Sequence, residues 1–167
     1  MQIHQIRKGV YSLCHYNESI EGITVLAMHP LLKGGISYRR RLSNFIRNHN
    51  GTILTFEESA KLESTAERYR KLTNGFAKNR LFIRTQPQEP EPVDMTWRDM
   101  IKFLESIKNG SPFMLIGGYR YNDQSQDFMG CLGVLEAMIY QSKFNYEVNE
   151  SLVFSNDHAS KEKRGLI

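Results

Sequence analysis

The sequence predicts an α/β fold: a three-layer Rossmann-like sandwich with a mostly parallel central sheet of five or six strands. Short apolar runs alternate with amphipathic stretches along the chain. The runs are apolar without interruption, as in strands that are covered on both faces. The stretches between them are long enough for right-handed crossover helices, which parallel neighbours require.

Five runs are the expected strands: residues 23–28, 52–56, 81–85, 113–117 and a looser run at 146–154. Three prolines between residues 86 and 94 exclude helix and central strand there, so this stretch is expected to be a loop. We expect one domain over residues 1–157 and a polar tail over residues 158–167.

Each expected helix has a start signal. Ser37 and Ser59 are predicted to cap the first and second helices, and Thr96 with Asp99 resembles a capping box at the third. Asn-Gly pairs are the expected ends of these three helices, at Asn50-Gly51, Asn74-Gly75 and Asn109-Gly110. The fourth helix, over residues 128–141, is apolar on nearly all sides and is therefore predicted to be a buried crossover.

The composition indicates which class of protein the chain belongs to. The chain of 167 residues has 40% hydrophobic and 24% charged residues, which is typical of a globular domain. Its two cysteines, Cys14 and Cys131, lie far apart without zinc-ligand spacing, which predicts free thiols and a reducing, cytoplasmic setting. We expect no cofactor, no metal site, no signal peptide and no membrane span.

Charge is distributed unevenly. The formal net charge is +4, but residues 1–84 hold 14 basic and 6 acidic side chains, and residues 85–167 hold 8 and 12. Residues 22–56 contain no acid. This pattern favours a small anionic molecule or a nucleotide as partner. Nucleic acid is disfavoured because the basic charge is moderate and lacks interleaved aromatics.

In a doubly wound sheet, ligands bind beyond the carboxyl ends of the strands. The loop after residue 28 carries Lys33, Gly34 and Gly35 just before a helix that contains Arg39, so we predict an anion site there. The alternative is a tight glycine turn followed by solvated arginines. After the second strand, Glu57 and Glu58 are placed either to contact a ribose or to complement a helix dipole.

The fourth strand ends in Gly117 and Gly118, and Cys131 follows near the start of the last helix. Free amides and the positive dipole end favour an ionised, nucleophilic thiolate in the first turn of a helix, and the same amides could hold an oxyanion. The alternative is that Cys131, on an apolar stripe, serves as a small buried hydrophobe.

Together these motifs resemble the isochorismatase-like cysteine hydrolases, whose triad comprises Asp, Lys and Cys. Residues 23–35 are similar to the first strand of that family and its following Gly-Gly, and residues 81–85 to the strand that ends in its lysine. Residues 113–118 are similar to the glycine-ended strand, residues 131–138 to the nucleophile helix and residues 144–148 to the next strand. The resemblance covers residues 23–157 and implies that Cys131 is the nucleophile.

Two triad positions differ from the family. Ala27 stands in place of the Asp and Arg84 in place of the Lys, and neither side chain can transfer a proton as its counterpart does. Substitutes for the missing Asp are Glu57, His29 or Asp127.

Three functions therefore remain open. The first is a divergent cysteine hydrolase that uses Cys131 and binds the anionic part of a small amide or ester through Arg84. The second is a non-catalytic nucleotide- or phosphate-binding module that uses Lys33, Gly34, Gly35 and Arg39, with Gly117 and Gly118 counted among the anion-binding residues. The third is a protein-assembly subunit, with a homo-oligomer as one form.

Overall fold

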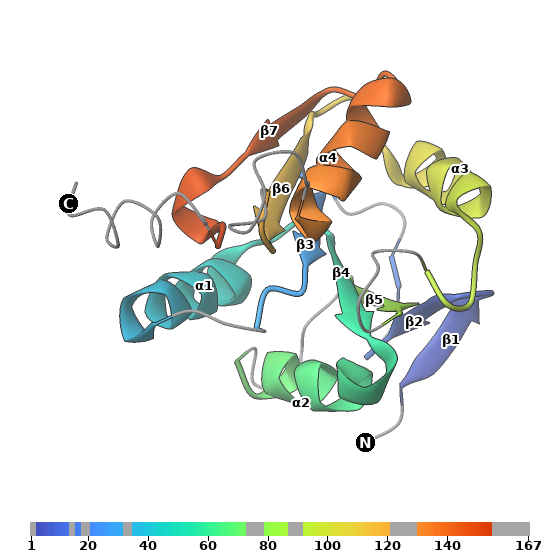
Figure 1. The fold of residues 1–167 in the computed structure, drawn as a ribbon. Coiled ribbons are helices and arrows are strands. Elements are labelled where there is room, and N and C mark those ends of the chain that lie inside the picture. Colours follow the sequence, from blue (N-terminus) through green and yellow to red (C-terminus); the bar gives the residue numbers. More distant parts are fainter. Residues whose placement is uncertain are drawn as a thin grey trace.

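The computed structural model describes residues 3–13, 16–17, 21–31, 35–72, 79–86, 92–120 and 130–154. Within these ranges a seven-stranded sheet lies between two layers of helices (Figure 1). The strands are β1 (His4–Arg7), β2 (Val10–Ser12), β3 (Val25–Met28), β4 (Ile53–Glu58), β5 (Arg80–Thr85), β6 (Phe113–Gly117) and β7 (Tyr146–Val148). The helices are α1 (Ile36–Asn48), α2 (Leu62–Leu72), α3 (Trp97–Ile107) and α4 (Cys131–Gln141).

The strand order is β1-β2-β5-β4-β3-β6-β7. Strands β5, β4, β3, β6 and β7 are parallel to one another, and β3 lies between β4 and β6. The chain therefore runs outward from β3 to β5 and then returns to the other side of β3 with β6. This arrangement is the doubly wound Rossmann-like architecture that the sequence predicts.

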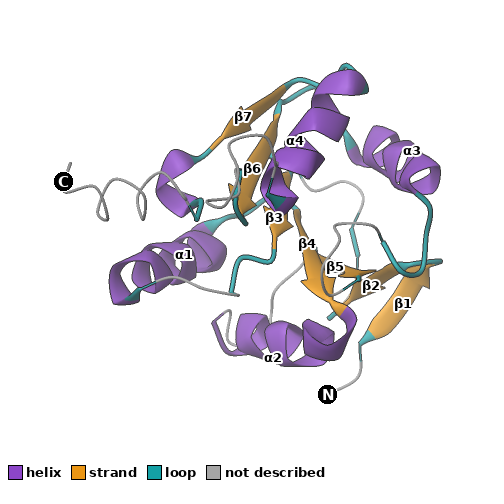
Figure 2. Cartoon of the chain, in the orientation of Figure 1, coloured by secondary structure: helices purple, strands orange, loops and turns teal. Residues whose placement is uncertain are grey.

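The side chains of β3 point alternately to the two faces of the sheet, and both faces are covered by helices. Leu26 and Met28 pack into one core with α3 and α4, and Val25 and Ala27 pack into a second core with α1 and α2. All four side chains are fully buried, which explains why the strand reads as a continuous apolar run. The two helical layers are seen on opposite sides of the sheet in Figure 2.

The strand count exceeds the expected five or six because β1 and β2 form a hairpin that the sequence did not indicate. They pair antiparallel with each other, and β2 pairs antiparallel with β5. Most of β1 is exposed, and its sequence His-Gln-Ile-Arg contains one apolar residue. A strand at the edge of a sheet needs no apolar run, so hydrophobicity did not reveal it.

Of the three predicted helix N-caps, the structure confirms Thr96 and corrects Ser37 and Ser59. The Oγ of Thr96 accepts a hydrogen bond from the Asp99 amide at 3.2 Å, which confirms the cap of α3. Ser37 is not a cap: α1 begins earlier with Gly35 as N-cap, and the Ser37 hydroxyl instead accepts a hydrogen bond from Arg41. Ser59 is not a cap either, because it opens a 3₁₀ turn that precedes α2.

Two further expectations need correction. Helix α4 is not buried all round, because Leu132, Leu135 and Ile139 are fully buried while Tyr140 is 73% exposed. The looser run at 146–154 is strand only over β7, after which Asn149 caps a 3₁₀ turn at Glu150–Leu152. The start predicted for the fourth helix and the tail at 158–167 lie outside the described residues.

The described ranges contain no helix that combines the length and apolar character needed to cross a membrane.

Candidate functional site

The candidate site lies where the winding of the sheet changes direction, at the carboxyl ends of β4, β3 and β6. His29 follows β3 directly, Glu57 lies near the end of β4, and Cys131 opens α4 after β6. Ligands in open α/β sheets bind at this kind of switch point. Three residues that are distant in the sequence therefore reach one edge of the sheet.

His29 occupies an unusual position. Its backbone has φ of 43°, in the left-handed region that few residues other than glycine adopt, and its amide donates to the Phe56 carbonyl at 2.9 Å. The residue is only 3% exposed. Nδ1 lies 3.5 Å from Oε1 of Glu57 in an ion pair, yet within the described part of the chain this buried nitrogen makes no hydrogen bond of ordinary geometry. Such a combination of backbone strain and an unsatisfied polar atom is characteristic of functional sites.

Glu57 is held in place from two sides. It is 1% exposed, its Oε2 accepts a hydrogen bond from the Thr65 hydroxyl of α2 at 2.8 Å, and its Oε1 accepts one from the Glu58 amide at 3.0 Å. These contacts fix the carboxylate beside His29. One expectation from the sequence was that Glu57 complements the dipole of the following helix. In the structure the contact from that helix is the hydrogen bond that the Thr65 hydroxyl donates.

Cys131 is the first residue of α4 and follows the N-cap Gly130. Its side chain is partly buried and packs against the core formed with α3 and α4. Cys131 therefore lies in the first helical turn and also packs against the apolar core, and its role as a nucleophile stays a prediction.

The pKa of His29 reflects these neighbours. Burial lowers this pKa, but interactions with Cys131 and Glu57 outweigh burial and raise the pKa from 6.5 to about 9. At neutral pH the ring is accordingly an imidazolium. The arrangement places a cation beside the Glu57 carboxylate, at the same edge of the sheet as the Cys131 thiol.

The amides at the start of α4 are mostly occupied. The amides of Leu132 and Gly133 donate to the Tyr119 carbonyl at 3.0 and 3.3 Å. The amides of Leu132 and Gly133 are therefore not available to hold an oxyanion, contrary to the expectation that several amides at this helix end could do so. Among the described residues, the Cys131 amide has no carbonyl acceptor, so it is the donor that remains at this end of the helix.

Gly117 and Gly118 allow the end of β3 to approach the start of α4. Their φ values are 74° and 53°. A Cβ on Gly117 would clash with the Met28 carbonyl, and one on Gly118 would lie 2.9 Å from Cβ of Leu132. These glycines therefore have a packing role on both sides of the site, and their predicted contact with an anion stays a prediction.

The predicted anion loop is described only in part, since Lys33 and Gly34 lie outside the described residues. Gly35 is the N-cap of α1, and Arg39 is an exposed residue one turn into this helix. The hydroxyl of Tyr38 donates to the Pro30 carbonyl at 3.0 Å, so the start of α1 is tied to the residue that follows His29.

Arg84 is engaged elsewhere on the sheet. Its guanidinium lies 4.8 Å from the centre of the Tyr11 ring, and its Nε lies 3.9 Å from Oδ2 of Asp94. These contacts join β5 to the N-terminal hairpin and to the segment before α3. The structure does not place Arg84 in the cluster of His29, Glu57 and Cys131, and its role in substrate binding stays a prediction.

Sequence reasoning named His29 as a substitute for a missing Asp, and Glu57 as another substitute or as a contact for a ribose or a helix dipole. The structure brings both of them to the edge of the sheet where Cys131 lies. The signal was the position of each at the end of a predicted strand. Asp127, the third substitute, lies outside the described residues. In the part of the chain that is described, no group of three potential ligands is arranged to hold a metal ion.

Comparison with known proteins leaves the family of this chain open. No family model matches the sequence, and no curated protein matches it. Among solved structures, the chain is similar to the terminal R domain from the myxalamid PKS-NRPS biosynthetic pathway, with 14% identity and a TM-score of 0.42. The match covers 75% of this chain and 33% of that one, so the chain spans about a third of the length of that structure.

Proposed function

We propose that this protein is a divergent cysteine hydrolase in which Cys131 is the nucleophile, His29 the proton donor and acceptor, and Glu57 the residue that orients His29. The observation that carries the proposal is the buried pair of His29 and Glu57, with 3.5 Å between Nδ1 and Oε1, at the carboxyl edge of the sheet where α4 begins with Cys131. The proposed substrate is a small ester or amide that bears an anionic group.

The first half of the reaction forms a thioester. The Cys131 thiolate attacks the carbonyl carbon, a C–S bond forms, and the oxygen becomes an oxyanion near the Cys131 amide. When the oxyanion collapses, the bond from carbon to the leaving oxygen or nitrogen breaks. The His29 imidazolium then gives its proton to the leaving group.

The second half regenerates the thiol site. His29, now neutral, takes a proton from water as the water oxygen attacks the thioester carbon. The C–S bond breaks, the acid product leaves, and Cys131 and His29 return to thiolate and imidazolium. Glu57 stays ionised throughout and holds the ring in one orientation, as the third member of a nucleophile-base-orienter arrangement does.

The resemblance to isochorismatase-like hydrolases supports the same nucleophile by a separate argument. Its cysteine is carried over as Cys131, while Ala27 is a fully buried core residue and cannot take the role of the Asp. In this proposal His29, two residues further along, replaces the missing acid-base group. The anionic substrate is supported by the imidazolium and by α1, whose first turn contains no acid.

Alkylation tests the nucleophile. With Cys14→Ser and Cys131→Ser variants, one thiol remains in each, and we expect iodoacetamide at pH 7 to label Cys131 several-fold faster than Cys14, because the proposed site places a cationic ring beside Cys131. Mass spectrometry of the Cys14→Ser protein with p-nitrophenyl acetate is then expected to show an acetyl group on Cys131. A Cys131 that reacts only after unfolding would contradict the proposal.

A second candidate function is phosphate or nucleotide binding at the start of α1. It is favoured by the uncapped N-terminus: Gly35 makes no side-chain cap, the first turn contains no acid, and Arg39 is exposed beside it. We propose it as a non-catalytic alternative or as the subsite for the anionic part of the substrate.

Thermal unfolding in phosphate tests the second candidate. At a phosphate concentration ten times Kd, binding stabilises the native state by about 1.4 kcal/mol, and the melting temperature rises accordingly. Arg39→Ala should reduce this increase, whereas Arg68→Ala, which removes an exposed arginine from α2, should leave it intact. An equal increase in chloride at matched ionic strength would show a general salt effect and exclude the site.

A further inference from the structure

The segment that follows β6 is attached to α4 by both its backbone and a side chain. The carbonyl of Tyr119 accepts hydrogen bonds from the second and third residues of the helix, and the carbonyl of Arg120 accepts one from the Gly130 amide at 3.0 Å. These bonds surround Cys131, because they engage the residues before and after it. The position of the thiol therefore depends on where residues 119 and 120 lie.

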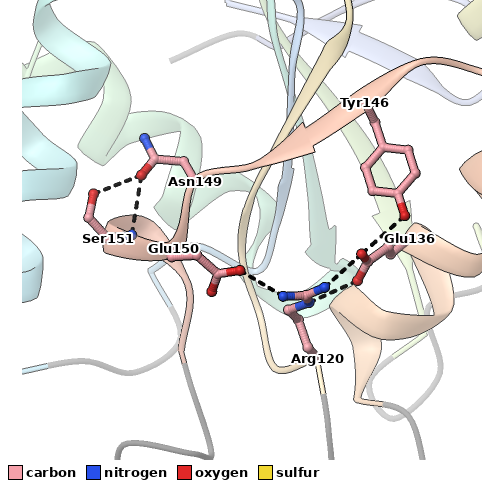
Figure 3. A network of polar contacts seen from close by, with 6 residues as sticks. All are labelled: Arg120, Glu136, Tyr146, Asn149, Glu150 and Ser151. Carbon is pink, nitrogen blue, oxygen red and sulfur yellow. Dashed lines mark hydrogen bonds and ion pairs between the residues drawn. The ribbon is translucent and has the colours of Figure 1, made fainter.

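The side chain of Arg120 reaches along the same helix (Figure 3). Its Nε and Nη2 donate to the two carboxylate oxygens of Glu136 at 2.9 and 2.8 Å. Its Nη1 donates to Oε1 of Glu150 at 2.7 Å. The Tyr146 hydroxyl donates to Oε1 of Glu136 at 3.1 Å, so β7 also contacts this carboxylate.

This network holds α4 against the sheet by a planar, directional contact. A bidentate arginine-carboxylate pair fixes both distance and orientation, which a lysine cannot do. The pair is partly shielded, with the Arg120 side chain 27% and that of Glu136 17% exposed. Since Glu136 lies little more than one turn beyond Cys131, any shift of this pair moves the first turn of the helix.

We infer that Arg120 is a positioning residue, which, through its pair with Glu136 and its carbonyl bond to Gly130, holds the start of α4, and with it Cys131, at the end of β3 where His29 lies. This inference rests on the proposed function. Arg120 itself does not touch the reacting atoms, and it acts by fixing the start of α4 relative to the end of β3.

The chain contains a matched control for this pair. On α2, Arg70 donates from Nε and Nη2 to both oxygens of Glu67 at 2.9 and 2.7 Å, in the same bidentate geometry. Arg70→Ala therefore removes a similar pair that lies within α2 and makes no contact with α4 among the contacts described. Arg120→Lys keeps the charge but loses the bidentate geometry and is expected to give an intermediate result.

The experiment compares these variants in a Cys14→Ser background. Arg120→Ala is expected to slow iodoacetamide labelling of Cys131 at pH 7 roughly fivefold, because the nucleophile is displaced from its partner. In parallel, NMR titration of the His29 ring is expected to show that its pKa moves from about 9 toward the ordinary value of 6.5. Arg70→Ala should change neither quantity, although urea unfolding should show a loss of stability.

The outcomes separate this inference from the proposed function. If Cys131 reacts rapidly in the parent protein and Arg120→Ala changes neither labelling nor the His29 titration, the positioning role is overturned and the hydrolase proposal stands. If Cys131 is slow in the parent protein, the hydrolase proposal fails, and the His29 titration still decides whether Arg120 positions the pair. Should Arg120→Ala fail to fold, Glu136→Gln removes the same charged contact and is measured in the same way.

Discussion

Replacing His29 with asparagine, in a protein that also carries Cys14→Ser, is expected to slow the alkylation of Cys131 at pH 7 several-fold, because the cationic ring that the proposal places beside the thiol is lost. Asparagine suits this position since it tolerates the left-handed backbone at φ 43°. Rates measured between pH 5.5 and 10 should then rise only in alkaline solution, as for a free thiol.

The control for this substitution is Lys143→Asn. Lys143 also has a left-handed backbone, with φ of 59°, and it is exposed beyond the end of α4. This change removes a cation and introduces asparagine as the first variant does, but away from the candidate site, and Cys131 should react as in the parent protein. Equal rates in the parent, His29→Asn and Lys143→Asn proteins would refute the thiolate-imidazolium pair.

The stability of the protein is expected to fall as the pH rises from about 6.5 to about 9. The pKa of His29 is raised from 6.5 to about 9 on folding, so in this window the folded state binds a proton that the unfolded state has lost. The stabilisation is fully present below pH 6.5 and is lost as the pH passes 9. Taken alone, a shift of this size corresponds to roughly 3 kcal/mol in the free energy of unfolding, and the proton that the proposed Cys131 thiolate gives up on folding subtracts from it.

Urea unfolding at several pH values between 6.5 and 9.5 measures this effect. His49 does not interfere, because its pKa is lowered by burial and it reduces stability only below pH 6.5. The raised pKa values of Tyr11 and Tyr146 act above pH 10, where these side chains ionise when unfolded. His29→Asn should flatten the dependence, whereas a fall that persists in this variant would assign the effect to other groups.

The fold could be predicted to the extent that hydrophobic patterning determines it. Strands β3 to β6 are buried on both faces and therefore read as apolar runs, and Thr96 caps α3 through a local contact that spacing reveals. The hairpin β1–β2 was missed because an edge strand is stabilised by pairing with β5 and needs no apolar run. The start of α1 was misplaced because Ser37 forms its hydrogen bond with Arg41.

The site was predicted residue by residue and not as a unit. Cys131 was named from its place near a helix start, but the pairing of His29 with Glu57 at the same edge of the sheet depends on strand order. Strand order results from long-range pairing, which apolar periodicity does not encode. Arg84 illustrates the same limit, because Tyr11 and Asp94, which it contacts, come from segments for which the sequence predicted no contact.

The placement of β3 between β4 and β6 has a consequence for synthesis of the chain. His29 and Glu57 leave the ribosome early, and the strand and helix that carry Cys131 into position come much later. Contacts between segments so far apart form only after a large part of the chain has been ordered. A nascent or truncated chain that lacks α4 therefore holds this histidine and carboxylate without Cys131, and under the proposed function no nucleophilic reactivity is expected before α4 is in place.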